Sequence, residues 1–180
     1  MAHIDTVYVC EMFRRSDRAR THAEKGRLLE DLIAYLFELI PGVSITARNA
    51  MNAFDAQEID IAFWNDGDVD GLRLFDHLLL VECKNWSTPV GYPELAVFYD
   101  KLQSRGRPIG ILIAAEGITG DKQLRTAAHE VLVRALANGR EILVVTRREL
   151  EQLHSTEELV TLLKRKRAQL TVSATVYELP

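Results

Sequence analysis

The sequence predicts an α/β fold in which helices flank both faces of a central mixed β-sheet. Three expected strands, residues 43–48, 58–64 and 78–84, follow an N-terminal helix, and strands at 109–115 and 141–146 then alternate with helices. Consecutive strands favour antiparallel neighbours, whereas strand–helix–strand units favour parallel ones, so the sheet should contain both kinds of pairing. No internal repeat or linker interrupts this order.

Helical periodicity marks the segments around these strands. Apolar residues recur at helical spacing over residues 17–40, which predicts one long amphipathic helix. Further helices are expected at residues 94–104, at 124–136, and from the capping box that begins at Ser155 to the basic tract that follows. The alternating tail, residues 171–177, predicts an edge strand.

The 180 residues suit one domain, expected to span residues 1–180 with its core at about 17–168. Residues 1–16 then form an N-terminal arm and residues 169–180 a C-terminal tail. No apolar stretch approaches the ~20 residues that span a bilayer. The first residues lack the charged-then-apolar pattern of a signal peptide, and two cysteines are too few for a disulfide framework. A soluble, cytoplasmic protein with no membrane partner is therefore expected.

The net charge of −4 argues against nucleic-acid binding by bulk attraction alone. Basic side chains nevertheless crowd residues 14–27 and residues 164–167. Each cluster either contacts phosphates or is a solvated helix face.

Charged residues inside two apolar strands predict the chemistry. Glu82 and Lys84 end the strand at residues 78–84 and project to one face, and Asp60 lies on the face opposite Ile59 and Ile61. Burying such charges is costly unless they are paired or hold an ion. If the two strands are hairpin neighbours, Asp60 and Glu82 share a divalent ion beside Lys84, an arrangement suited to phosphodiester hydrolysis.

A third carboxylate is expected from the first long helix. On a helical projection Glu30 falls at the border of the apolar arc, where it can lean over the sheet. The alternative is that Glu30 is a solvated residue at the rim of the helix.

Taken together, a helix glutamate, an aspartate at the start of a hairpin and a Glu-x-Lys ending the next strand resemble the PD-(D/E)xK restriction-endonuclease-like nucleases. The Mrr-type catalytic domain is the most similar branch, and the resemblance extends over residues 26–146. It implies a restriction-endonuclease-like core with Glu30, Asp60, Glu82 and Lys84 as the catalytic residues.

The resemblance also implies the cofactor and the role of each residue. Asp60, Glu82 and the main-chain carbonyl of Cys83 would bind Mg²⁺, with Mn²⁺ as a substitute. Glu30 would assist through a second ion or a water, and Lys84 would position the nucleophile. Asp55 is an alternative to Asp60 as a ligand. For the further polar residue that the family often carries on the next helix, the candidates are Lys101 and Gln103.

The expected function is Mg²⁺-dependent cleavage of DNA by an endonuclease of restriction or antiviral defence. The alternatives are a Holliday-junction resolvase or repair nuclease, an effector activated by a partner protein, and a non-catalytic nucleic-acid-binding module. Specificity is expected from residues 49–57 or from a partner. A homodimer, with contacts through residues 171–177, is a further expectation.

Overall fold

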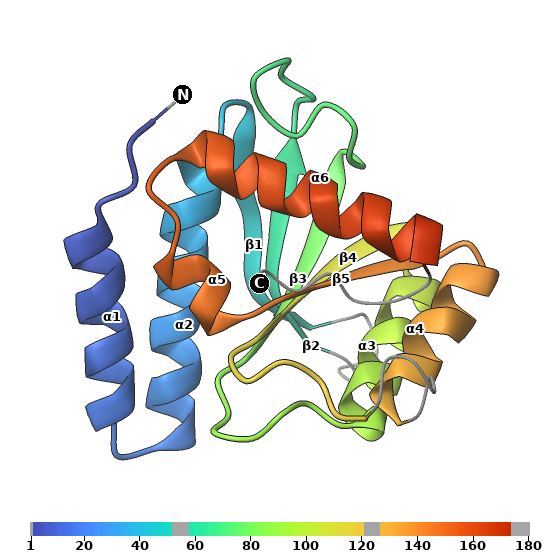
Figure 1. Ribbon diagram of the computed structural model, residues 1–180, viewed down its shortest axis with the longest axis horizontal. Coiled ribbons are helices and arrows are strands. Elements are labelled where there is room, and N and C mark those ends of the chain that lie inside the picture. The colour runs from blue at the N-terminus through green and yellow to red at the C-terminus, as the bar shows by residue number, and fades with distance from the viewer. Residues whose placement is uncertain (1, 52–57, 121–126, 174–180) are drawn as a thin grey trace.

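The computed structural model describes residues 2–51, 58–120 and 127–173. Within these residues, five strands form one sheet, which six helices surround (Figure 1). In chain order the elements are α1 (Thr6–Arg18), α2 (His22–Glu38), β1 (Val43–Met51), β2 (Glu58–Asn65), β3 (Leu78–Lys84), α3 (Tyr92–Ser104), β4 (Ile109–Ala114), α4 (Ala128–Ala137), β5 (Glu141–Val145), α5 (Arg147–Glu151) and α6 (Thr156–Ser173).

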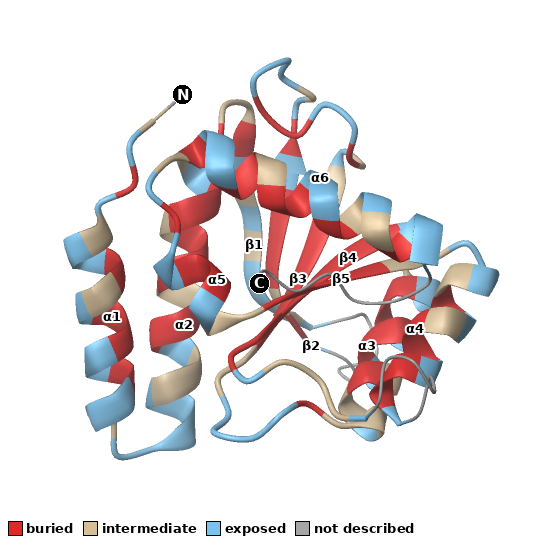
Figure 2. Ribbon diagram, viewed as in Figure 1, coloured by how far each residue is buried: buried red, intermediate tan, exposed pale blue. Residues whose placement is uncertain are grey.

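The sheet is mixed, as the sequence predicts. Its strands lie in the order β1-β2-β3-β4-β5. The pairs β1–β2 and β2–β3 are antiparallel, whereas β3–β4 and β4–β5 are parallel. The inner strands β3 and β4 are mostly apolar and are buried on both faces (Figure 2). A charged side chain at the end of either strand is therefore largely shielded from water.

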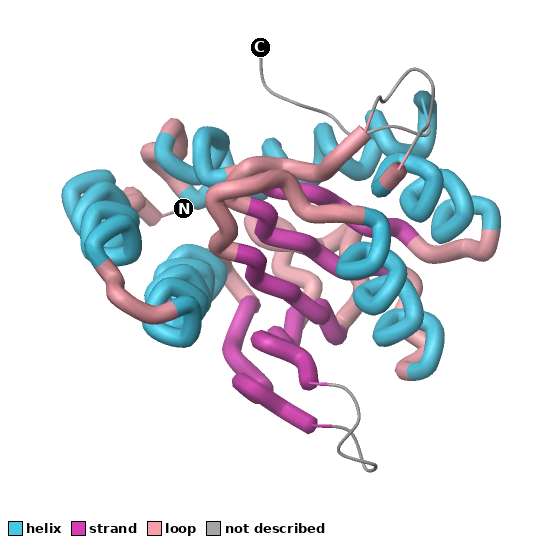
Figure 3. The backbone as a smooth tube through the Cα atoms, turned by 90° about the horizontal axis from the view of Figure 1, so that it is seen from below, coloured by secondary structure: helices cyan, strands magenta, loops and turns pink. Residues whose placement is uncertain are grey.

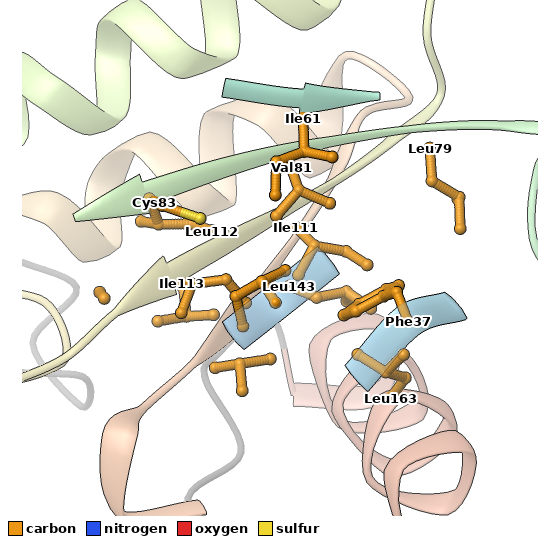
Figure 4. Close-up of a cluster of buried hydrophobic side chains, with 14 of the residues drawn as sticks. Phe37, Ile61, Leu79, Val81, Cys83, Ile111, Leu112, Ile113, Leu143 and Leu163 are labelled. Carbon is orange, nitrogen blue, oxygen red and sulfur yellow. The ribbon is translucent and has the colours of Figure 1, made fainter. Parts of the chain in front are cut away.

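Helices cover both faces of this sheet (Figure 3). On one face Phe37 of α2 stacks on Phe63 of β2, with 4.9 Å between ring centroids. Leu163 of α6 joins the same cluster, together with side chains of β2 to β5 such as Ile61, Val81, Ile111 and Leu143 (Figure 4). The opposite face is covered by α3 and α4.

The N-terminal region differs from the expectation. Residues 6–16 are not an arm but most of α1, whose Val9, Met12 and Phe13 are buried. The expected helix at 17–40 is also wrong as a single element, because the chain is extended at Ala19 and α2 begins only after Thr21. The Thr21 side chain accepts a hydrogen bond from Glu24 N, which caps a new helix.

The C-terminal tail is likewise helical where the structure describes it. Thr171 Oγ1 donates to Arg167 O over 3.0 Å, and Leu170 is buried, so α6 continues through Ser173. The expected edge strand is therefore wrong for residues 171–173, and its remaining residues lie outside the described part. Residues 124–126 of the expected fourth helix also lie outside it.

The long connection between β2 and β3 is organised by one buried side chain. Asn65 Nδ2 donates to the carbonyl oxygens of Leu72 and Asp76, over 2.9 and 3.1 Å. The Asn65 side-chain oxygen accepts from Gly67 N, where φ is +75°. This network holds the two strands as hairpin neighbours although twelve residues separate them.

Two further sequence expectations concern membranes and cysteines. Within the described part of the chain, none of the helices has the length and apolar character needed to cross a bilayer. Cys10 and Cys83 are both free.

Gly110 of β4 sets how closely α3 lies on the sheet. A Cβ at this position would lie 2.7 Å from both Leu102 Cδ2 and Phe98 Cζ of α3. Because these two side chains are fully buried, they have little room to yield.

We expect Gly110→Val to lower the free energy of unfolding by about 1–3 kcal/mol through overpacking between β4 and α3. Chemical denaturation measures the change. The matched control is Gly26→Ala in α2, where a Cβ would meet only Glu30 Oε1 at 3.9 Å. That variant should gain up to about 1 kcal/mol from helix propensity. Equal stability of Gly110→Val and the parent protein would contradict the packing argument.

Candidate active site

The hairpin of β2 and β3 brings two carboxylates together. Ile61 pairs with Val81 and Ala62 with Leu80, so the same antiparallel register places Asp60 beside Glu82 at the end of the pairing. Both side chains belong to the sheet face that α3 covers, because they alternate with Ile61, Val81 and Cys83 on the opposite face. The predicted neighbourhood of the two acids is thus present.

Glu82 is almost completely buried and contacts two lysines. Lys84 Nζ lies 2.9 Å from Oε1. Lys101 Nζ, from α3, donates to both carboxylate oxygens, over 2.9 Å to Oε1 and 2.7 Å to Oε2. The side chains of Glu82 and Lys101 are 5% and 8% exposed. Two ammonium groups therefore compensate one buried carboxylate.

Asp60 accepts a short hydrogen bond from the backbone. Its Oδ2 lies 2.6 Å from Cys83 N. Burial, and next the charge of Glu82, raise the pKa of Asp60 to about 6, although the Cys83 hydrogen bond and the two lysines act in the opposite direction. The raised pKa shows that burial and the neighbouring Glu82 carboxylate together outweigh the stabilisation of the Asp60 anion by the two lysines.

Burial acts on the pKa of Lys84 in the direction opposite to its effect on Asp60, because Lys84 is charged when protonated. Burial alone would lower its pKa, but the adjacent Glu82 carboxylate and then Asp60 more than offset this effect and raise the pKa. Lys84 is therefore protonated at neutral pH. In this state it can donate hydrogen bonds and carries a positive charge.

Cys83 lies between these charges in the sequence, but its side chain belongs to the core. The thiol is buried, and burial first, followed by the charges of Asp60, Glu30 and Glu82, raises its pKa well above the usual range. The residue is an inert, small apolar group (Figure 4).

Glu30 belongs to α2, on the other side of the sheet, and its carboxylate contacts β1. Its Oε2 accepts from Asn49 Nδ2 over 3.4 Å and lies 3.7 Å from Arg48 Nη2. The Glu30 side chain is 14% exposed, so it leans over the sheet rather than standing in solvent as a rim residue. Within the described residues it has neither a hydrogen bond nor an ion pair with Asp60, Glu82 or Lys84.

Three other candidates have different outcomes. Asp55 lies outside the described residues. Gln103 is exposed, whereas Lys101 enters the site.

Sequence analysis missed Asn49, which lies between residues paired with Ile61 and Ile59 and therefore opposite Asp60. The φ of Asn49 is +49°, which asparagine tolerates. The only signal of this in the sequence is that Asn49 is a polar residue that interrupts the strand pattern.

The basic segments are used in two ways. Arg14, Arg15, Arg18, Arg20 and Arg27 are exposed on α1, on α2 and between them. In the second segment Lys166 is buried 2.7 Å from Glu149, and Arg167 pairs with Glu141, so these two side chains are already engaged inside the protein. Only the first segment presents a row of exposed arginines.

A divalent cation is compatible with the carboxylates at this site. Asp60 and Glu82 offer hard oxygen ligands, and the pKa of Asp60 is raised by burial first and by the Glu82 charge next, both of which a bound cation would offset. Within the described part of the chain, however, no three His, Cys, Asp or Glu side chains are grouped closely enough to hold a metal. The two carboxylates would need main-chain or water oxygens as further ligands.

The pKa of Asp60 leads to a stability prediction. Because it rises from 3.8 to about 6 on folding, ionisation of Asp60 destabilises the folded protein as pH increases from 4 to 6. In metal-free buffer, Asp60→Asn should therefore be more stable than the parent protein by about 2 kcal/mol at pH 7.5 and nearly equal at pH 4. Urea denaturation across this range measures the difference. A difference that does not vary with pH would contradict the assigned environment.

Comparison with known proteins agrees with the fold. Residues 22–154 match the family model of the Mrr catalytic domain, described as a restriction endonuclease. Over 78 residues the chain is 36% identical to the type IV methyl-directed restriction enzyme EcoKMrr of Escherichia coli (strain K12). This alignment covers 41% of the chain and 25% of that enzyme, so the chain matches about a quarter of its relative's length. The chain belongs to the Mrr-type restriction endonuclease family.

Proposed function

We propose that this protein is a Mg²⁺-dependent endonuclease that cleaves DNA in restriction or defence against foreign DNA. The proposal rests on one observation above all. Asp60 and Glu82 lie side by side at the end of a buried hairpin, and Lys84 is in contact with Glu82. A soluble, cytoplasmic location, with Mn²⁺ able to replace Mg²⁺, is part of the same proposal.

The residues divide the work of phosphodiester hydrolysis. When bound, Mg²⁺ would activate water and offset negative charge on the reacting phosphate. Asp60, Glu82 and the main-chain carbonyl of Cys83 would hold the ion. Lys84, which is protonated, orients the attacking water and adds positive charge, while Glu30 supports the water network or a second ion.

The exposed arginines of α1 and α2 support DNA as the substrate. Asn85, which directly follows Lys84, donates to Ser16 Oγ over 2.6 Å and to Lys25 O over 2.9 Å. The junction of α1 and α2 is thus fastened to the end of the catalytic strand. Arginines on this junction would contact phosphates of a duplex whose scissile bond lies at Glu82.

The name of the relative makes methylated DNA the first substrate to test. EcoKMrr is described as methyl-directed. Since the chain matches only a quarter of that enzyme, the same preference is a proposal for this protein. Methylated and unmethylated forms of one plasmid are suitable substrates.

We expect the protein to nick or linearise supercoiled plasmid in Mg²⁺ or Mn²⁺ but not in EDTA. Asp60→Asn and Lys84→Ala should each reduce the rate by about 10² or more, because each removes a group that stabilises the transition state. Gel electrophoresis of a time course measures the rates.

The matched control for Lys84 is Lys164→Ala, which removes an exposed lysine of α6 and should leave the rate unchanged. Unaltered cleavage by Asp60→Asn would place the active site elsewhere. Cleavage of branched DNA in preference to the plasmid would favour the junction resolvase or repair alternative.

Glu30→Gln should have a smaller effect than Asp60→Asn, about tenfold, because Glu30 lies outside the Asp60–Glu82 pair and acts through water or a second ion. The Asp31→Asn variant is its control, since Asp31 also pairs with Arg48 but is 42% exposed. A loss as large as that of Asp60→Asn would make Glu30 a principal ligand.

One observation favours a second candidate, a non-catalytic or partner-activated DNA-binding module. Both Glu82 oxygens already accept hydrogen bonds from Lys101, so the carboxylate is satisfied without a metal. DNA binding without cleavage in any divalent ion would support this alternative. Activation by an added partner protein or by dimerisation would distinguish an effector from a binding module.

A further inference from the structure

We propose that Lys101 is a positioning residue that competes with the divalent cation for Glu82 and so keeps the site weakly loaded until DNA arrives. This inference rests on the proposed function, because it presumes that Asp60 and Glu82 hold the ion. It adds a control on metal loading that neither the strand motif nor the family match contains.

The Lys101 ammonium group occupies the position at Glu82 that a bound metal ion would take. Its Nζ bridges both oxygens of Glu82, at 2.7 and 2.9 Å. Lys84, the lysine of the strand motif, contacts only Oε1. A cation ligated by Glu82 must therefore share or displace the hydrogen bonds of Lys101.

The location of this contact makes the competition strong. Lys101 and Glu82 are 7% and 4% exposed, so water screens their interaction poorly. A metal ion entering beside them meets the Lys101 ammonium at close range. Repulsion between the two positive charges lowers the affinity of the site for the ion.

The fold limits how far Lys101 can withdraw. Lys101 lies on α3 between Phe98 and Leu102. These two side chains pack against Gly110 of β4. Because α3 is held in this way, Lys101 stays beside Glu82 unless its own side chain changes rotamer. The packing of α3 thus fixes the backbone of Lys101 beside the site.

Charge balance then links the metal to DNA. With Asp60 ionised, the two carboxylates are balanced by Lys84 and Lys101, so an added divalent cation leaves the buried cluster with excess positive charge. A DNA phosphate supplies the missing negative charge. Metal and DNA should consequently bind more tightly together than apart.

The test is Mn²⁺ titration of the DNA-free protein by calorimetry. Lys101→Met keeps the length and apolar stem of the side chain but removes its charge. It should bind Mn²⁺ at least about tenfold more tightly than the parent protein. Lys101→Arg, which keeps the charge, should not gain affinity. Addition of Mn²⁺ should also raise the Tm of Lys101→Met more than that of the parent.

A second buried lysine provides the control. Lys166 of α6 lies 2.7 Å from Glu149 Oε1, with side chains 2% and 3% exposed. Lys166→Met therefore breaks a comparable buried pair away from the site, and its Mn²⁺ affinity should match that of the parent. If Lys101→Met fails to fold, Lys101→Gln removes the same charge and retains a hydrogen-bond donor.

The outcomes separate the inference from the proposed function. Tighter binding by Lys101→Met, abolished by adding Asp60→Asn, supports the competition. Equal affinity of Lys101→Met and parent, with binding still dependent on Asp60, overturns the competition and leaves the nuclease proposal intact. Absence of Asp60-dependent Mn²⁺ binding in every variant overturns the metal site, and the competition with it.

Discussion

The arrangement of the whole site depends on the burial of one carboxylate, that of Glu82. Placed at the end of a strand between Val81 and Cys83, and opposite Leu112 of β4, it is too costly to bury alone. Its compensation comes from two directions, Lys84 on the same strand and Lys101 on α3. The register of β3 and the docking of α3 on β4 must therefore both be correct before this charge is stabilised. Loss of either contact leaves Glu82 undercompensated, which links local packing to site chemistry.

A second buried Glu–Lys pair shows that such burial alone does not define a site. Glu149 and Lys166 join α5 to α6, at 2.7 Å and with nearly no exposure. Glu82 differs because Asp60 lies beside it, and burial first and the Glu82 charge next raise the pKa of Asp60. Crowded acids on adjacent strands, rather than a buried charge as such, distinguish the site from a structural ion pair.

Strand alternation made the core of the site predictable, whereas packing between distant elements did not. Asp60, Glu82 and Lys84 could be assigned to one face because β2 and β3 are neighbours in both sequence and space. The contact of Lys101 with Glu82 depends on where α3 crosses the sheet, which its own residues specify only weakly. The α1 helix was missed although Val9, Met12, Phe13 and Ser16 have helical spacing. Charged residues interrupt that apolar stripe in the sequence, and the break before α2 depends on local capping at Thr21.

Backbone contacts join the N-terminal segment to the start of α6. Ile4 N donates to His154 O and Thr156 N donates to Ala2 O, each over 3.0 Å, around a bridge between His3 and Ser155. During synthesis on a ribosome, the N-terminal segment emerges long before the partners that fix it. Its backbone groups must stay hydrated until residues 154–156 leave the exit tunnel, while the β2–β3 hairpin can pair far earlier. The pair of Asp60 and Glu82 can therefore form before the N-terminal segment binds to residues 154–156.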